Sequence, residues 1–419
     1  MKKKLLLVVL SYVLAVVMIS GCHDSSTNTS VIQVEYDVNK AIESYLSGLS
    51  AIPDADKDYL IEMGYNDCDH MVAAIIGEKT GLYTALGLNV NVTKTGKVAE
   101  AMSSGDMVVG YAGFKGMITT ANKGAPILMP AGSHLGGSKY MVIKPDIEKP
   151  EEIVGTKITL TEADMYSPYW LNYCKELGIP TDVTLYEGFD MSQSDAMFAL
   201  KAGTIDGFMC CDPYASIAEL EGFGKIVGTE WGAEVSEDLE TGWGLHCGYF
   251  INSDFAKAHP ELTTRLTLAH CLSIQYMYLH PYNASMMFAD GFGCDPAVAL
   301  RTIYIKTCAE GRTLTWNVNE ENINNYTAYW HSFGIPEDKI PEVNDVPSFL
   351  DLSYLDNCGI ESFSTFLNAN GINEHFPVRM SYSDWLLKAE DIDGVDHSSQ
   401  VGKTVDKWNR GQVVTKLSS

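Results

Sequence analysis

Four residues that can bind ligands or metals, Asp67-Cys68-Asp69-His70, stand between an apolar run at 58–65 and a helical pattern at 70–80. A carboxylate accepts hydrogen bonds, and an imidazole is a donor, an acceptor or a metal ligand. Asp69 is placed to cap the helix, while Asp67 and His70 can face a ligand. The alternative is that Asp67 and Asp69 only cap the helix and that His70 is satisfied within its loop. Loop placement favours the functional role.

A second segment, Gly113-Phe114-Lys115, joins a strand-like run at 107–111 to a helical pattern at 115–122. A glycine lets the backbone approach a ligand closely, and free amides at a helix start suit a carboxylate, sulfonate or phosphate. Phe114 is expected to stack on a planar ligand. The competing interpretation is a plain tight turn, because a lone glycine motif is weak.

Corresponding turns in the second half of the chain contain further candidate ligand contacts: Tyr166, Ser167, Ser192, Asp212 and Tyr214. Pro168 suits the first turn of a helix and makes Ser167 a good cap. Asp212 suits a cationic or hydrogen-bond-donating group, and Tyr214 can pack on a ring. We expect the loop side chains of His70 and Tyr214 to carry little core packing.

Strand-like and helix-like runs alternate in two successive blocks. The first block has strands at 58–65, 88–93 and 107–111 and helices at 70–80, 98–102 and 115–122; the second has strands at 157–160, 183–186 and 205–210 and helices at 167–177 and 194–201. A leading helix is expected within 34–52, and after a strand at 247–252 the pattern is mostly helical. The alternation predicts parallel sheets in two lobes. The candidate loops each follow a strand, so we expect them to meet in one cleft.

The beginning of the chain has the pattern of an export signal. Lys2, Lys3 and Lys4 precede a mostly apolar stretch at 5–17, which is short for a permanent membrane span. The following Ile19-Ser20-Gly21-Cys22 resembles the bacterial lipobox, which implies removal of residues 1–21 and a lipid on Cys22. An ordinary signal peptide with a chance cysteine is the alternative. The polar residues 23–30 are typical of a flexible tether.

The composition excludes one class of partner. The formal net charge is −25, with 54 acidic against 29 basic residues. Nucleic-acid binding is not expected, because contacts to phosphates need a basic face. An acidic surface still allows an anionic ligand, since backbone amides bind anions locally.

Several segments, in their order along the chain, resemble the nitrate, sulfonate, taurine and thiamine-precursor class of periplasmic binding proteins. They are Gly81-Leu82-Tyr83 with Gly87-Leu88-Asn89-Val90, Ser104-Gly105-Asp106, Lys123-Gly124-Ala125-Pro126-Ile127, Ala199-Leu200-Lys201-Ala202-Gly203, Cys211-Asp212-Pro213-Tyr214 and Asp351-Leu352-Ser353-Tyr354. The likeness covers about residues 58–360. It departs from the family at Cys211, where an aromatic residue is usual, and the chain after 360 has no counterpart.

The resemblance implies a two-lobed α/β clamshell of the type 2 periplasmic binding proteins, each lobe a mostly parallel sheet flanked by helices. Lobe 1 would comprise 58–143 and 245–360, and lobe 2 would comprise 144–244, with hinge strands near 142–144 and 245–249. Residues 22–57 would form the tether and leading helix, and residues 361–419 an extension of unknown role. Ser138 lies before the first hinge and is a candidate donor to the ligand, unless its loop only bends the chain.

The implied function is capture of a small solute outside the cytoplasm by a monomer, anchored to the membrane through Cys22, and its delivery to the permease and ATPase of an ABC importer. An anion or a heteroaromatic compound is the expected solute. An enzyme on the same fold and a ligand-sensing receptor are the alternatives. The sequence has no Gly-x-Ser-x-Gly, phosphate loop or His-Glu-x-x-His, so no catalytic residue is assigned.

The cysteines and histidines of the expected cleft allow two interpretations, a metal site or buried thiols. Residues able to bind a soft metal fall in loops expected near the cleft: Cys68, His70, Cys210, Cys211, His246 and Cys247. Neither cysteine pair has the spacing of a zinc finger, and adjacent cysteines rarely chelate one ion together. The sequence alone therefore favours incidental thiols, and no metal or cofactor is predicted.

Overall fold

The computed structural model describes residues 36–136, 139–229, 245–343, 349–403, 408 and 413–418. The predicted signal peptide, the lipidation site Cys22 and the candidate donor Ser138 lie outside these residues. Within them, no helix has both the length and the apolar character that a membrane crossing requires.

The first sheet has five strands in the order β2-β1-β3-β10-β4. The strands are β1 (Leu60–Tyr65), β2 (Asn89–Lys94), β3 (Val109–Gly113), β4 (Ile127–Leu135) and β10 (Leu245–Asn252). β1 runs parallel to β2 and β3, whereas β10 is antiparallel to β3 and β4. Four of the five coincide with predicted strands, and β4 was not predicted.

The second sheet has the order β7-β6-β8-β5-β9. Its strands are β5 (Tyr140–Ile143), β6 (Lys157–Ile158), β7 (Glu187–Gly188), β8 (Gly207–Cys210) and β9 (Lys225–Thr229). The strand predicted at 183–186 is wrong: Val183–Leu185 forms a 3₁₀ turn, and the Asp182 side chain accepts the Thr184 amide at 3.0 Å. A local aspartate cap here replaces pairing within the sheet.

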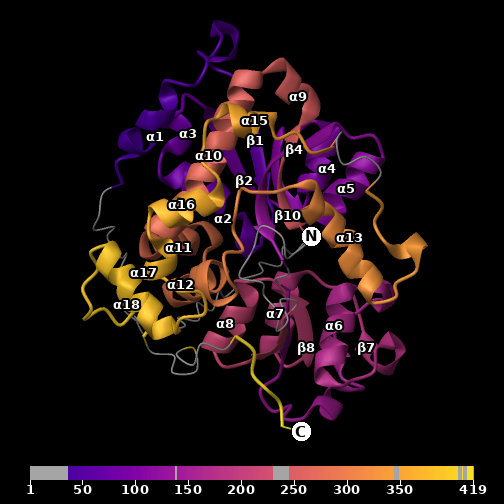
Figure 1. Ribbon diagram of the computed structural model, residues 1–419. Coiled ribbons are helices and arrows are strands. Elements are labelled where there is room, and N and C mark those ends of the chain that lie inside the picture. The colour runs from indigo at the N-terminus through magenta and orange to yellow at the C-terminus, as the bar shows by residue number, and fades with distance from the viewer. Residues whose placement is uncertain are drawn as a thin grey trace, which may run out of the picture. The chain divides into compact units, whose positions relative to one another are not determined.

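The two sheets define two lobes, called lobe 1 and lobe 2 below. Figure 1 shows lobe 1 in the upper part and lobe 2, with β7, β8 and α6 to α8, in the lower part. The chain enters lobe 2 between β4 and β5, before the boundary predicted at 143, and returns between β9 and β10. In each sheet the first strand after a crossing, β5 or β10, is inserted antiparallel. The sheets are therefore mixed: in each of them four strands run in one direction, as expected of a mostly parallel sheet, and the inserted strand runs against them.

Helices cover both sheets. Lobe 1 has α1 (Val38–Leu46), α2 (Val72–Lys79), α3 (Leu82–Ala85), α4 (Val98–Ser104), α5 (Phe114–Asn122), α9 (Ser253–Ala258), α10 (Pro260–Leu279), α11 (Pro281–Phe292), α12 (Pro296–Tyr304), α13 (Glu320–Ser332) and α15 (Ser353–Asn357). Lobe 2 has α6 (Pro168–Leu177), α7 (Gln193–Lys201) and α8 (Tyr214–Leu220). Helices α6, α10, α11 and α12 each begin at a proline, which fits the first turn because an amide donor is not needed there.

The C-terminal extension adds helices to the core of lobe 1. These are α16 (Phe363–Ala369), α17 (Ile372–His375) and α18 (Tyr382–Ile392), and Figure 1 shows α17 and α18 beside α11 and α12. Phe363, Phe366 and Trp385 belong to the same hydrophobic core as α10 and α11. The extension of previously unassigned role is thus part of the folded domain.

The end of the chain reaches lobe 2. The Thr415 amide donates to the Ile226 carbonyl on β9 at 2.7 Å, and the Ser418 amide donates to the Glu148 carbonyl at 3.0 Å. Trp408 contacts both lobes: its indole donates to Glu219 on α8 at 3.3 Å, and the Arg301 guanidinium of α12 lies 4.6 Å from its ring centre.

Candidate functional site

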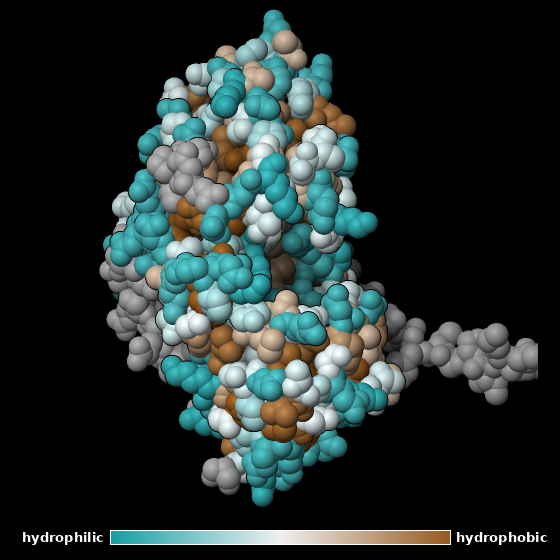
Figure 2. All heavy atoms as spheres, turned by 90° about the vertical axis from the view of Figure 1, so that its right-hand side faces the viewer, coloured by the Kyte–Doolittle hydropathy of each residue, from teal (hydrophilic) through white to brown (hydrophobic). Residues whose placement is uncertain are grey.

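A cavity of about 690 Å³ lies between the lobes, within the usual range for small-molecule sites. Lobe 1 contributes Asp67, Gly113 and Lys115 to its wall, and Ser167 and Tyr214 come from lobe 2. On the face in Figure 2, the surface is hollowed between its upper and lower parts. The carboxyl ends of strands from both sheets thus open onto one space, as the topology predicts.

The structure places the predicted contacts in three groups. Seven line the cavity: Asp67, Gly113, Phe114, Lys115, Ser167, Ser192 and Tyr214. Four do not line it: Asp69, His70, Tyr166 and Asp212. Ser138 lies outside the described residues.

The expectation of little core packing is wrong for His70, which is buried, and the neighbouring Asp69 is fully buried as well. Asp69 is also not the predicted helix cap, because it lies inside a 3₁₀ turn, Asp69–Met71, that precedes α2 and makes no side-chain cap. Its carboxylate lies 3.6 Å from the Lys306 ammonium. Burial raises the pKa of Asp69 to about 7, although Lys306 opposes the shift.

Asp212 is likewise fully buried and has protein partners instead of a ligand. Its carboxylate accepts the Ser216 amide and hydroxyl, each at 2.9 Å, and the Thr302 hydroxyl of α12 at 3.4 Å. Its carbonyl accepts the Asp69 amide at 3.0 Å. Asp212 therefore fixes the start of α8 and joins the lobes.

The rings of Phe114 and Tyr166 pack on other protein side chains. Phe114 is fully buried and packs edge-on against Tyr326 and Phe349 in the core of lobe 1. Tyr166 has the Lys339 ammonium 5.6 Å from its ring centre and packs on the same core. Tyr214 does line the cavity, where its hydroxyl donates to Asp67 across the cleft.

Two lysines give the cavity a positive region. Lys115 lies over the Trp330 ring at 4.7 Å, and Lys139 lies over the Tyr169 ring at 4.9 Å. Burial, and then the proximity of Lys139, lower the pKa of Lys115. Within the described part of the chain, neither ammonium has a carboxylate within 4.0 Å. The sequence did not single out Lys139, because its role depends on the crossing between β4 and β5.

The acidic groups at the cavity wall are already bound by the protein. Asp67 pairs with Lys94 at 3.6 Å and accepts the Tyr214 hydroxyl. Asp164 accepts the Thr161 amide and hydroxyl at 2.7 and 2.8 Å. These partners reduce the repulsion that an anion would meet. The amides at the start of α5 add a further attractive field.

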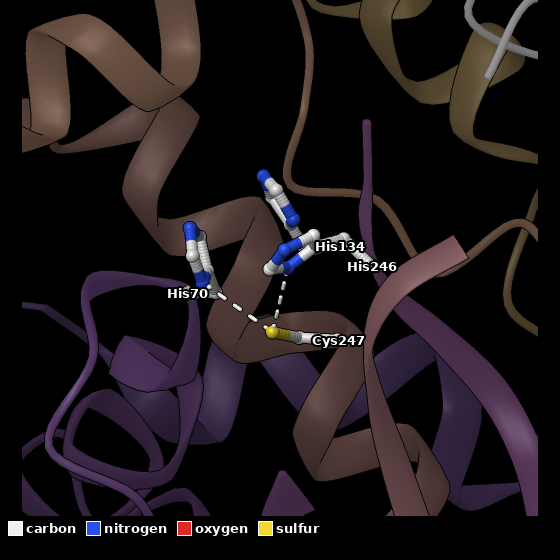
Figure 3. A group of neighbouring side chains, drawn as sticks. All are labelled: His70, His134, His246 and Cys247. Carbon is white, nitrogen blue, oxygen red and sulfur yellow. Dashed lines mark hydrogen bonds between the residues drawn. The ribbon is translucent and has the colours of Figure 1, made fainter. Parts of the chain in front are cut away.

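Three histidines and Cys247 lie together at the floor of the cavity, which His246 and Cys247 line. Figure 3 shows these four side chains. The Nδ1 atom of His70 lies 2.9 Å from Cys68 Sγ and 3.4 Å from Cys247 Sγ. His246 Nδ1 lies 3.1 Å from Cys247 Sγ, and the His134 ring stacks on His70 at 4.0 Å. Cys211 is the fourth residue of an overlapping group with Cys68, Asp69 and His70.

Strand pairing explains this convergence. Cys247 on β10 is the partner of His134 on β4, and register shifts on either side of Cys247 interrupt the strict alternation of side chains. His246 and Cys247 therefore reach the same cluster although they are adjacent in sequence. Cys210 belongs instead to the core of lobe 2. His134 was missed because β4 and its pairing with β10 were not predicted.

Residues 54–289 match the model of the NMT1-like family. Over 172 residues, the chain is 27% identical to the taurine-binding periplasmic protein of Escherichia coli (strain K12). That match covers 39% of this chain and 49% of the relative, so the chain spans about half the length of the curated protein that it matches.

Solved structures share the fold at low identity. The ligand-binding component of an ABC-type import system from Staphylococcus aureus with zinc bound has a TM-score of 0.56 and 13% identity, covering 71% of this chain and 98% of its own. The alkanesulfonate-binding protein from Xanthomonas axonopodis pv. citri bound to MOPS has a TM-score of 0.55 and 14% identity, and the match covers 72% of this chain and 100% of that protein. The nitrate-binding protein from Synechocystis PCC 6803 has a TM-score of 0.53 and 13% identity, and the match covers 80% of this chain and 98% of that protein. These likenesses confirm the two-lobed α/β clamshell.

Proposed function

The chain belongs to the NMT1-like family, and from this premise we propose that it captures a small anion outside the cytoplasm and delivers it to the permease of an ABC importer. The observation that carries the proposal is the cavity between the lobes, with Lys115 and Lys139 at its wall. A ligand that contacts both lobes favours their closed arrangement, which is the state a transporter can recognise. We assign no reaction to the cleft.

An anion suits the cavity better than a cation. Lys115 and Lys139 offer ammonium groups, while Asp67 and Asp164 are bound by Tyr214, Lys94 and Thr161. Sulfonates and nitrate, which appear in the names of the related proteins, are anions of suitable size. The Trp330 and Tyr169 rings under the lysines hold the two cations in place.

Replacing Lys139 by methionine is expected to weaken binding of the preferred anion by about 10- to 100-fold, because a charge-assisted hydrogen bond contributes roughly 1.5–3 kcal/mol. The measurement is isothermal titration with taurine, an alkanesulfonate and nitrate. Lys123→Met, at the exposed end of α5, is the matched control and should bind normally. If none of the three anions binds the unmodified protein, or if both variants bind alike, the proposed anion site is wrong.

The membrane anchor is a separate proposal, supported by the lipobox-like residues before Cys22. Cys22→Ser is expected to leave the chain unprocessed or to release it from the membrane fraction, because the serine hydroxyl cannot take the thioether-linked lipid. Fractionation with radiolabelled palmitate measures both effects, and Cys294→Ser serves as a control for incidental acylation. Normal labelling and processing of Cys22→Ser would contradict the proposal.

A further inference from the structure

The cluster at the floor of the cavity combines imidazole and thiol groups in a way that anion capture does not require. We propose that His70, His134, His246 and Cys247 form a binding site for one thiophilic transition-metal ion, with Zn²⁺ as the representative. The site goes beyond the proposed function, because Lys115 and Lys139 can attract an anion without it.

The four side chains are close enough to share one ion. One ligand atom from each lies within 4.8 Å of all the others. Ligands about 2.0–2.3 Å from a tetrahedral metal are roughly 3.3–3.7 Å apart, so the set requires movements on the order of 1 Å. It also requires rotation of the His134 ring out of its stack on His70, because lone pairs of stacked imidazoles do not converge on one ion. His70, His246 and Cys247 already contact one another at 3.1 and 3.4 Å through the thiol.

His134 gives an independent indication of a missing ligand. Its side chain is fully buried, and neither ring nitrogen has a hydrogen-bond partner among the described residues. A buried polar group without a partner costs free energy, and native structures rarely retain one. A metal ion at the cluster would satisfy one nitrogen of His134 directly.

Outer partners lie beside two of the imidazoles. His70 Nε2 lies 3.2 Å from the Asp69 carboxylate without the geometry of a hydrogen bond, while its Nδ1 lies 2.9 Å from Cys68 Sγ, so a small rotation of the ring would make Asp69 an outer partner. His246 Nε2 lies 3.1 Å from the Tyr169 hydroxyl, and its Nδ1 faces Cys247. Histidine ligands of metals commonly have such a partner on the second nitrogen. Burial, and then the neighbouring histidine and Lys306, lower the pKa of His70, which keeps its imidazole neutral and able to coordinate.

The ion has a path to the site, because His246 and Cys247 line the cavity. Cys68 and Cys211 also reach the cavity wall and place two more sulfur atoms beside the cluster. Imidazole together with thiolate favours Zn²⁺ or Cu⁺ over Mg²⁺ and Ca²⁺, which prefer oxygen ligands.

The test is titration of the full chain, reduced and freed of metal, with Co²⁺ followed by Zn²⁺. One equivalent of Co²⁺ should produce the absorption of a tetrahedral site with a thiolate-to-cobalt charge-transfer band, and Zn²⁺ should remove it. His134→Ala should weaken Zn²⁺ binding by at least about 100-fold, the upper end of the loss caused by an outer partner. Cys247→Ser should remove the charge-transfer band.

Cys174→Ser is the matched control, because Cys174 is a buried thiol of α6 in the core of lobe 2. It should leave the cobalt spectrum and the Zn²⁺ affinity unchanged, and circular dichroism verifies that each variant is folded.

Absence of binding to the unmodified chain overturns the proposal. So does a charge-transfer band that survives in Cys247→Ser but is lost in Cys68→Ser or Cys211→Ser, since the ligands would then be the overlapping group. Anion titration of the metal-free chain tests the proposed function separately.

Discussion

Replacing Arg301 by alanine is expected to lower the free energy of unfolding by about 3–5 kcal/mol, the usual cost of leaving one partner of a buried ion pair alone. Its guanidinium lies 2.8 Å from the Glu219 carboxylate, and the two side chains are only 4% and 3% exposed. The remaining Glu219 would retain the Trp408 indole as a donor at 3.3 Å but would lose its counter-charge. Urea unfolding, with the midpoint and slope both measured, gives the change.

An exposed ion pair on lobe 2 is the control. Lys201 and Glu221 are 50% and 43% exposed, so Lys201→Ala should cost no more than about 1 kcal/mol. The double variant Arg301→Leu with Glu219→Leu should be more stable than Arg301→Leu alone, because no unpaired charge remains. An equal loss in the free energy of unfolding for Arg301→Ala and Lys201→Ala would contradict the prediction that the buried pair stabilises the fold more than the exposed pair.

Trp385→Ala, in the C-terminal extension, is expected to destabilise the chain by about 3–5 kcal/mol, as for other large core aromatic residues. The side chain is 1% exposed and packs with Tyr304 of α12 and Tyr382 of its own helix. The residual cavity can collapse only in part, because rigid helices surround it. Thermal or urea unfolding measures the loss.

Leu387 lies two residues further along α18 and is 40% exposed, which makes it a matched position on the opposite side of the helix. Leu387→Ala should change the free energy of unfolding by about 0.5 kcal/mol or less. A Trp385→Ala variant as stable as Leu387→Ala would mean that α18 is not integrated into the core of lobe 1.

The order of strands and helices could be predicted from the sequence where a glycine ends a helix and an apolar run follows, as at Gly81, Gly105 and Gly203. β1, β2 and β8 lie within or near their predicted ranges. β4 was missed because Pro130 and Gly132, residues that rarely occur inside strands, interrupt its otherwise buried sequence. The sequence does not reveal the role of the extension after 360, because the family resemblance ends there, whereas in the structure its aromatic residues pack on α10 to α12.

The candidate site was predicted as a set of loops, and the cavity does collect most of them. Which side chains turn inward could not be predicted, because this depends on partners distant in sequence. Asp69 is held by Lys306, Asp212 by Thr302, and Phe114 by Tyr326. Adjacency of Cys210 and Cys211 argued against a metal, but the structure separates the two thiols between different cores.

The contacts at the end of the chain affect how the two lobes can rotate relative to each other. Two bodies joined only by the crossings after β4 and β9 can rotate about the line through those crossings. Residues 413–418 add a third attachment on β9, and Trp408 lies against Arg301 of lobe 1 and Glu219 of lobe 2 at once. Other contacts join the same two helices, α8 and α12, among them Arg301 with Glu219 at 2.8 Å. A rotation that separates these helices therefore has to break the contacts of Glu219 with both Arg301 and Trp408, so Trp408 stabilises the arrangement of the lobes described here.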